Sequence, residues 1–283
     1  MTRILVSGAT GFVGSALNRR LLGSDKYVVH TSSSRSGDVA EADTWNTLPE
    51  VDVVVHLAAR TFVPDSWTDP VAFLRTNFTG TTLALEFCRR HRSRLVFLSS
   101  YLYGNPKRLP IDETAEISTP NPYALSKKLA EDACRFYSES FNLDATVLRV
   151  FNIYGGGQGD KFLIPSIVRQ VLQGTAINVK DLAPKRDFLY IDDLVEAIVC
   201  AIESPQRFEV FNIASGTSHS VQDVIDVVQR VADRSVPVHS EGVRRQNEIM
   251  DTLGDISKAR RMLSWAPRWS IESGVAEILR TGG

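Results

Sequence analysis

Tyr123 and Lys127 stand four residues apart, so on a helix both side chains would lie on one face. A free tyrosine has a pKa of about 10 and is a poor acid or base at neutral pH, whereas a nearby ammonium favours the phenolate. Ser99 and Ser100 end an apolar run earlier in the chain. A hydroxyl opposite the phenol would orient a reacting alcohol or carbonyl, and we expect Ser99 in that role. Together these groups could transfer a proton while a cofactor transfers a hydride.

The same spacing also occurs by chance, in which case Tyr123 and Lys127 would be a surface pair. Three observations favour catalysis, and the first is the glycine-rich segment Gly8 to Gly14 near the N-terminus. Pro122 would stiffen the start of the helix that presents Tyr123. Ser99 ends its strand, and open α/β sheets place their chemistry at the carboxyl ends of strands.

A glycine-rich segment follows the first strand-like run and opens a helix-like one, which is the context of a dinucleotide-binding loop. Such a loop lets backbone N–H groups approach a pyrophosphate at a helix N-terminus. The glycines here are spaced three and three, whereas the commoner fingerprint has two and three. A turn without a ligand is the alternative. The expected cofactor contacts are Gly8, Thr10, Gly11, Phe12, Val13 and Gly14.

The choice of nicotinamide cofactor depends on the residues after the second strand. A carboxylate there would bind the ribose hydroxyls of NAD, but the first acid is Asp38. The hydroxyls of Ser32 and Ser34 and the guanidinium of Arg35 suit a 2′-phosphate better. We therefore favour NADP over NAD. The alternative is that Arg35 is a solvated loop residue.

Short apolar runs alternate with longer amphipathic ones, which predicts an α/β fold: a Rossmann-type, doubly wound parallel sheet with a smaller C-terminal substrate-binding lobe. Nearly continuous apolar runs indicate strands covered on both faces. The expected strands are Ile4–Ser7, Val28–Thr31, Val53–Leu57, Leu95–Ser99, Ala145–Arg149 and Val210–Ala214. The expected helices are Gly14–Leu22, Thr76–Arg90, Tyr123–Phe141, Phe162–Gln173, Asp192–Glu203 and Val221–Ala232. Residues 1–156 with 187–214 would form the dinucleotide-binding domain, and 157–186 with 215–283 the lobe.

The composition narrows the class of protein. A net charge of −1 over 283 residues gives no electrostatic reason to bind nucleic acid or an anionic membrane. No apolar run approaches the roughly 20 residues of a membrane span, and the N-terminus does not resemble a signal peptide. The five histidines lack metal-ligand spacing, so no metal is expected. Three separated cysteines indicate free thiols and a cytoplasmic location.

In combination, the motifs resemble those of the extended short-chain dehydrogenase/reductases, in the NAD(P)-dependent nucleotide-sugar epimerase/dehydratase branch. The resemblance runs nearly end to end and implies a nucleotide-sugar substrate. The motifs that carry it are Gly8 to Gly14, His56 to Ala59, Asn77 with Gly80-Thr81, Ser99 to Gly104, Tyr123 to Lys127, Arg149 to Gly155, Arg186 to Phe188 and Phe211 to Gly216.

The resemblance also implies roles for individual residues. Aligning backward from Tyr103-Gly104 places Ser99, rather than Ser100, at the catalytic hydroxyl. Glu248, where the family often has Asp, and Phe162, where UDP-galactose 4-epimerases often have Asn, are departures. The implied cofactor contacts are Asp38, Val39, Leu57, Ala58, Ala59, Asn77, Tyr123, Lys127 and Phe151. The implied substrate contacts are Ser99, Ser100, Tyr101, Asn152, Phe162, Arg186 and Arg245.

Three reactions compete within this family. The chain lacks the Thr-Asp-Glu typical of dehydratases. A 4-ketoreductase of the nucleotide-4-keto-6-deoxyhexose type uses an exchangeable NADPH, which the Ser32–Arg35 stretch favours narrowly. A nucleotide-sugar 4-epimerase of the UDP-glucose/galactose type, with tightly bound NAD, is the alternative. A non-catalytic module that senses dinucleotides is disfavoured because the tyrosine and lysine are both present. A homodimer is expected through the two helices that carry Leu83, Phe87, Leu129 and Phe136.

Overall fold

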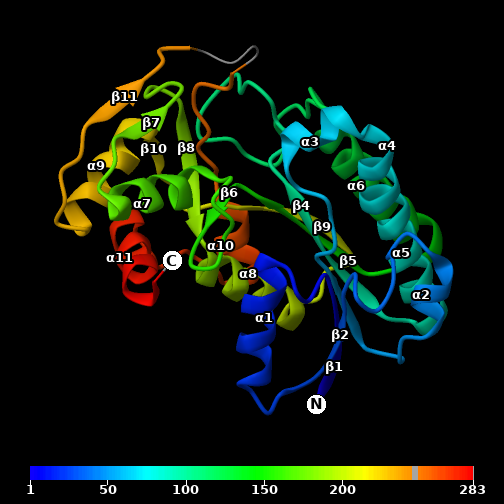
Figure 1. The fold of residues 1–283 in the computed structure, drawn as a ribbon. Coiled ribbons are helices and arrows are strands. Elements are labelled where there is room, and N and C mark those ends of the chain that lie inside the picture. The colour runs from blue at the N-terminus through cyan, green and yellow to red at the C-terminus, as the bar shows by residue number, and fades with distance from the viewer. Residues whose placement is uncertain (244–247, 283) are drawn as a thin grey trace.

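A parallel six-stranded sheet in the order β2-β1-β3-β4-β5-β9 forms the centre of the protein (Figure 1). The computed structural model describes residues 1–243 and 248–282. The order turns back at β1, which pairs with β2 on one side and β3 on the other. The strands are β1 (Thr2–Ser7), β2 (Tyr27–Ser32), β3 (Val53–His56), β4 (Arg94–Ser100), β5 (Ala145–Val150) and β9 (Phe208–Ile213).

Helices cover both faces of this sheet because alternate strand residues point to opposite sides. Ile4 and Val6 of β1 belong to the apolar cluster that also holds the buried residues of α1 (Phe12–Leu22) and α8 (Ile191–Glu203). Leu5, between them, belongs to a second cluster with α5 (Gly80–His91) and α6 (Pro122–Phe141). The remaining helices near this sheet are α2 (Ala42–Asn46), α3 (Val63–Thr68), α4 (Pro70–Phe73), the π-helical turn η1 (Leu74–Thr79) and α10 (Ser257–Leu263).

Later segments build a smaller lobe beside the carboxyl ends of the central strands (Figure 1). It contains a three-stranded sheet in the order β10-β8-β6 and a parallel pair of β11 with β7. Helix α9 begins with a capping box between Ser220 and Asp223. The elements of the lobe are β6 (Asn152–Tyr154), α7 (Leu163–Gln173), β7 (Ile177–Val179), β8 (Lys185–Tyr190), β10 (Ser218–Ser220), α9 (Val221–Val231), β11 (Val238–Ser240) and α11 (Ile271–Thr281).

The expected strands and helices are present, with one internal difference. The expected helix Thr76–Arg90 is divided into the π-helical turn η1 and the α-helix α5. Strands β6 and β8 lie outside the central sheet and pair with each other, and β8 also pairs with β10. They therefore connect the sheet to the lobe, and the two-domain division of the chain stays a prediction.

The three cysteines are unpaired, as expected, with Cys88 and Cys134 buried and Cys200 partly buried. Burial raises the pKa of all three thiols, so they act as small apolar side chains. In the described part of the chain, no helix has both the length and the apolar character needed to cross a bilayer.

Candidate active site

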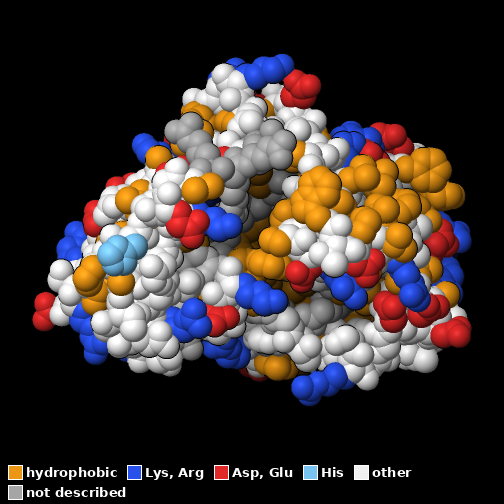
Figure 2. All heavy atoms as spheres, turned by 45° about the horizontal axis from the view of Figure 1, so that its top comes forward, with side chains coloured by type: hydrophobic (Ala, Val, Ile, Leu, Met, Phe, Trp, Pro, Cys, Tyr) orange, Lys and Arg blue, Asp and Glu red, His pale blue; other side chains and the backbone are white. Residues whose placement is uncertain are grey.

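A cavity of about 520 Å³ opens between the carboxyl ends of the central strands and the lobe. Figure 2 shows the hollow between the two parts of the molecule. It lies where the strand order reverses between β1 and β3, the usual position for a ligand in an open α/β sheet. Of the expected site residues, those lining it are Gly8, Gly11, Phe12, Val13, Gly14, Leu57, Ala59, Ser99, Ser100, Tyr101, Tyr123, Lys127, Phe151, Asn152, Phe162 and Arg186.

The glycine loop is shaped for a phosphate group. Gly8 has a φ of +74°, which favours glycine, and a Cβ on Gly14 would lie 2.2 Å from the Gly8 carbonyl oxygen. The helix can therefore approach the strand closely only with glycine at that position. Gly11 caps α1 without a side-chain hydrogen bond, and the first turn of α1 carries no acid. The N–H groups of this turn are thus suited to the pyrophosphate of a dinucleotide.

Tyr123 lies at the start of α6, whose entry is fixed by its sequence. The Asn121 side chain accepts a hydrogen bond from the Ala124 N–H at 2.8 Å, and Pro122 occupies the first helical position. Burial raises the pKa of the Tyr123 phenol, while a hydrogen bond with the Ser100 side chain acts in the opposite direction. The expectation of a phenol with a lowered pKa is therefore wrong for the protein by itself. Removal of the phenol from water is the stronger effect.

Ser99 and Ser100 exchange the roles that the sequence suggested. The Ser99 hydroxyl donates to Glu131 at 2.5 Å in a buried contact. Ser100 lines the cavity with Tyr123, and its side chain acts to lower the pKa of the phenol, while its hydroxyl donates to the Tyr101 carbonyl at 3.5 Å. Adjacent strand residues present their side chains differently, so only one of the two hydroxyls can meet the phenol. The assignment of Ser99 as the hydroxyl beside Tyr123 is corrected to Ser100.

Lys127 is buried one helical turn after Tyr123, with its Nζ 2.6 Å from the Leu98 carbonyl oxygen. The ammonium also lies 4.3 Å from the centre of the Phe97 ring, at a distance typical of a cation–π contact. Burial lowers the pKa of this amine to about 8, and Glu131 partly offsets the effect. A lysine that titrates near neutral pH at the edge of a cavity is a feature of functional sites.

This lowered pKa predicts how stability changes with pH. An unfolded lysine has a pKa of about 10.4, so between pH 8 and pH 10 the unfolded chain binds the proton that folded Lys127 loses. Unfolding free energy therefore rises with pH in this window. Between pH 7.5 and 10, the stability of the natural protein relative to Lys127→Met should rise by roughly 2 kcal/mol, measured by urea denaturation.

The comparison with Lys127→Met isolates this effect. The raised pKa values of the Cys88 and Cys134 thiols lower stability at alkaline pH. Cys88 does so equally in both proteins. Lys127 lowers the pKa of Cys134, so this thiol destabilises the variant somewhat more and adds to the expected difference. Parallel stability curves would contradict the prediction.

Asn77, expected near the cofactor, braces the protein backbone instead. Its Oδ1 accepts from the Arg60 N–H at 2.8 Å, and its Nδ2 donates to the Arg60 carbonyl at 3.0 Å and to the Ser126 hydroxyl at 2.9 Å. These bonds engage both ends of its amide and tie the segment after β3 to α6. Asn77 therefore holds cavity residues such as Ala59 in place and does not line the cavity.

The residues expected around the adenosine half lie beyond the cavity lining. Ser32 is buried, while Ser34 and Arg35 are exposed beside it. The Asp38 carboxylate accepts from the Ala40 N–H and lies 3.6 Å from an Arg75 nitrogen. Val39 is buried. Two other expected cofactor contacts also lie outside the lining: Thr10 of the glycine loop, which is exposed, and Ala58 after β3, which is partly buried.

On the substrate side, Arg186 reaches the cavity from β8. It pairs with Glu248 and donates to the Ile249 carbonyl at 2.6 Å. The alternatives of an ion pair with Asp187 or Asp192 are therefore wrong. Asn152 is exposed at the start of β6. Arg245 lies outside the described residues.

Two aromatic residues shape the walls of the cavity. Phe162 packs edge-on against Phe62, with ring centres 6.1 Å apart. The Tyr101 hydroxyl donates to the Gly104 carbonyl at 2.5 Å, and burial raises the pKa of this phenol. The Tyr101 side chain is therefore fixed in the cavity wall, and its hydroxyl proton is hydrogen-bonded to the backbone.

Several lining residues were not expected from the sequence. Gln158 follows a run of glycines, and its Nε2 donates to the Ile153 carbonyl at 3.0 Å. A polar residue directly after a run of glycines is a feature by which Gln158 could have been identified from the sequence. Others lie in irregular segments without a spacing pattern: Ser118, Pro120, Asn121, Ile249 and Thr252.

Comparisons with known proteins show which proteins the chain is similar to. The model of the NAD dependent epimerase/dehydratase family matches residues 4–214. The chain is 29% identical to a GDP-6-deoxy-D-mannose reductase from Pseudomonas aeruginosa, over 98% of this chain and 96% of the relative. It is 30% identical to an uncharacterized UDP-glucose epimerase from Bacillus subtilis, over 96% of this chain and 95% of the relative.

Solved structures give the same result. The structure of RMD from Pseudomonas aeruginosa complexed with NADPH has a TM-score of 0.91 and 28% identity, covering 99% of this chain and 98% of that one. A UDP-glucuronic acid 4-epimerase from Bacillus cereus, in complex with UDP-glucuronic acid and NAD, has a TM-score of 0.90 and 26% identity, covering 99% and 100%. These matches confirm the expected resemblance and fold class.

Proposed function

Because the chain belongs to the NAD dependent epimerase/dehydratase family, we propose that it is an NADPH-dependent reductase of carbon 4 in a nucleoside diphosphate 4-keto-6-deoxyhexose. One observation carries this proposal. The Tyr123 phenol meets the Ser100 side chain in the cavity that the glycine loop opens into. The similarity to a GDP-6-deoxy-D-mannose reductase supports a reductase.

Each of the three polar residues has a defined task. Bound NADPH would supply the hydride. Tyr123 donates its proton to the oxygen of the sugar ketone, which its raised pKa favours because the phenol stays protonated at neutral pH. The Ser100 hydroxyl hydrogen-bonds the same oxygen and stabilises its developing charge. Lys127, which here donates to the Leu98 carbonyl, would hold the ribose hydroxyls of the cofactor.

The glycine loop and the segment after β2 would hold the dinucleotide. The N–H groups at the start of α1 would bind the pyrophosphate, and Gly14 permits the close approach of helix and strand. Arg35 and Ser34 are both exposed in the turn that follows β2. These two side chains suit the additional phosphate of NADP.

Replacing Arg35 with alanine should change cofactor selectivity. A hydrogen bond to a charged group contributes about 1.5–3 kcal/mol, so we expect NADPH to bind roughly 10- to 100-fold more weakly. NADH lacks the 2′-phosphate and should bind unchanged. Fluorescence titration of both cofactors tests this. Equal loss for the two cofactors, or none for either, would show that Arg35 does not read the phosphate.

Native mass spectrometry of the purified protein distinguishes the reductase from the 4-epimerase. A reductase must exchange its cofactor at each turnover, so we expect a protein without bound dinucleotide that takes up added NADPH. An epimerase regenerates its cofactor within the cycle, so retained NAD would support that activity. Relatives of both kinds are similar to this chain.

We further propose a homodimer in the cytoplasm. Apolar side chains gather beside the hollow over α3, α4 and α6 (Figure 2). Trp67, Val71, Leu125, Phe136 and Phe141 are exposed there by 65%, 71%, 40%, 56% and 46%. An apolar surface of this kind supports a protein interface. Phe87, expected to be compatible with this interface, is fully buried in the core. The unpaired cysteines support a reducing compartment.

Introducing a charge at Phe136 should dissociate the dimer. Burying an unpaired carboxylate in an apolar interface is costly, so Phe136→Glu should shift the protein to a monomer in sedimentation experiments. Leu172→Glu is the matched control, because Leu172 is 43% exposed on α7 in the lobe. Equal sedimentation of Phe136→Glu and the natural protein would contradict this interface.

A further inference from the structure

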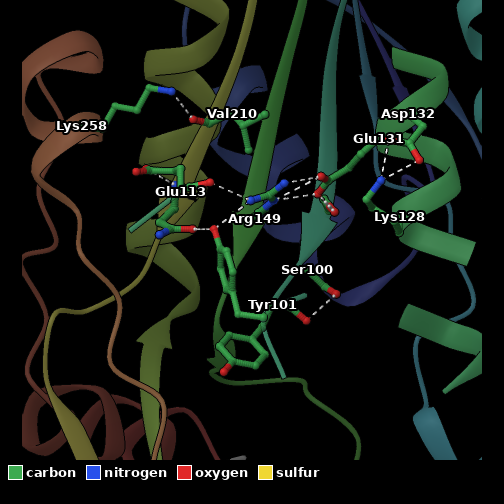
Figure 3. A network of polar contacts seen from close by, with 12 residues as sticks. Ser100, Tyr101, Glu113, Lys128, Glu131, Asp132, Arg149, Val210 and Lys258 are labelled. Atoms are coloured by element: carbon green, nitrogen blue, oxygen red, sulfur yellow. Dashed lines mark hydrogen bonds and ion pairs between the residues drawn. The ribbon is translucent and has the colours of Figure 1, made fainter. Parts of the chain in front are cut away.

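A buried network of polar side chains begins at the helix that carries Tyr123 and Lys127 (Figure 3). The Glu131 carboxylate accepts from Arg149 Nη2 at 2.7 Å and from the Ser99 hydroxyl at 2.5 Å. The side chains of Glu131 and Arg149 are each only 5% exposed. The ion pair therefore fixes α6 to β5, and the bond to Ser99 fixes α6 to β4.

The network continues away from α6 through a buried tyrosine. The Arg149 Nη1 donates to the Tyr103 hydroxyl at 3.0 Å, and that hydroxyl donates to Asn212 Oδ1 at 2.5 Å. The Nδ2 of Asn212 then donates to the Ile111 carbonyl at 2.9 Å. Each of these polar groups has a partner, so the path is continuous from α6 across β5 and β9.

The path ends on a segment that lines the cavity. Ile111 donates its N–H to the Leu253 carbonyl at 2.7 Å and accepts from the Asp255 N–H at 2.8 Å. Gly254, between these two, is packed so closely that a Cβ would lie 3.1 Å from the Phe151 ring. Thr252, two residues earlier, lines the cavity.

The same segment is fixed to the arginine on the substrate side. The Thr252 hydroxyl accepts from the Asp187 N–H at 3.2 Å. Arg186, the neighbour of Asp187, bonds the Ile249 carbonyl and Glu248. Residues 248–254 are therefore held by β8 on one side and by the buried network on the other.

A buried ion pair of this kind is weak evidence for stability, because well-packed apolar residues are often equally stable in its place. We propose that Arg149 and Tyr103 are positioning residues for the nucleotide sugar. They set segment 249–254 at a fixed distance from Tyr123 and Ser100, so that carbon 4 meets the phenol. The inference rests on the proposed function.

Tyr103→Phe tests this with the loss of a single hydroxyl. We expect KM for the keto sugar to rise roughly tenfold and kcat to fall several-fold, because a misplaced substrate loses both binding and alignment. The Kd for NADPH should stay within about twofold, since the network does not reach the glycine loop. Asn212→Ala breaks the path one step later and should raise KM in the same way.

Tyr137→Phe is the matched control. Tyr137 is also buried, lies on α6 itself and loses a hydroxyl bond to Glu86 of 2.6 Å, outside the network. The melting temperature of Tyr137→Phe should fall as much as that of Tyr103→Phe, while the KM of Tyr137→Phe stays unchanged. Equal KM values for the two variants would overturn the positioning role.

Direct binding separates this inference from the proposed function. GDP and UDP are titrated against the natural protein and Tyr103→Phe by calorimetry. We expect one of them to bind the natural protein and to bind the variant more weakly. Equal affinity for both proteins overturns the inference alone. No binding to the natural protein overturns the proposed nucleotide-sugar substrate, and the inference with it.

Discussion

Tyr123→Phe should lower kcat about 10²- to 10⁴-fold, the usual contribution of a positioned acid. The variant keeps the ring, which packs edge-on against Phe73 with centres 6.3 Å apart, and loses only the proton donor. The Ser100 side chain also loses its partner. The Kd for NADPH should be nearly unchanged, because the glycine loop and Lys127 are untouched. Steady-state kinetics and cofactor titration measure the two effects separately.

Tyr137→Phe again provides a control on the same helix, and its kcat should match that of the natural protein. A Tyr123→Phe variant that retained full turnover would show that another group supplies the proton. A variant that lost cofactor binding together with turnover would indicate a disturbed fold and would also contradict the expected result.

Ser100→Ala should have the second largest effect, a fall in kcat of roughly 10²-fold, because it removes a hydrogen bond to the oxygen that gains charge. Ser99→Ala should lower kcat much less, by about three- to tenfold. The Ser99 hydroxyl bonds Glu131 and would affect the reaction only through that contact. The pair of variants compares two adjacent hydroxyls on one strand.

The reverse order of the two effects would contradict the geometry. If Ser99→Ala abolished turnover and Ser100→Ala did not, the Ser99 hydroxyl would have to leave Glu131 and face the substrate. The sequence alone favoured Ser99 as the catalytic hydroxyl, because alignment backward from Tyr103-Gly104 selects that residue.

The elements that position the site could be predicted because their signals are local. The apolar run Val53–Leu57 corresponds to β3 (Val53–His56), and the glycine spacing corresponds to a close contact of α1 with β1. Pro122 at the start of α6 gave the helix boundary directly. Each of these features depends on neighbours in the chain, so spacing rules suffice.

The roles of the two serines could not be predicted because they depend on a distant partner. Glu131 lies one turn after Lys127 on α6, and its bond to the Ser99 hydroxyl joins residues 32 positions apart. A buried carboxylate needs partners, but the sequence does not state which hydroxyl supplies one. The pKa of Tyr123 was misjudged for a related reason, because the degree of burial is a property of the fold.

Arg186 shows the same limit for the substrate side. Its two acidic neighbours in the sequence suggested an ion pair, yet its partner Glu248 lies 62 residues away. The cavity residues Ile249 and Thr252 come from the same distant segment. Long-range pairing of irregular segments leaves no periodic pattern, so the lobe side of the site emerged only from the structure.

NADPH that carries deuterium in both positions of nicotinamide carbon 4, with NMR of the product, tests the central claim most directly. We predict one deuterium at carbon 4 of the hexose for each NADP released, because Tyr123 and Ser100 meet in the cavity beside the glycine loop. A sugar inverted at carbon 4 without consumption of NADPH, or a ketone that stays unreduced, would contradict the account.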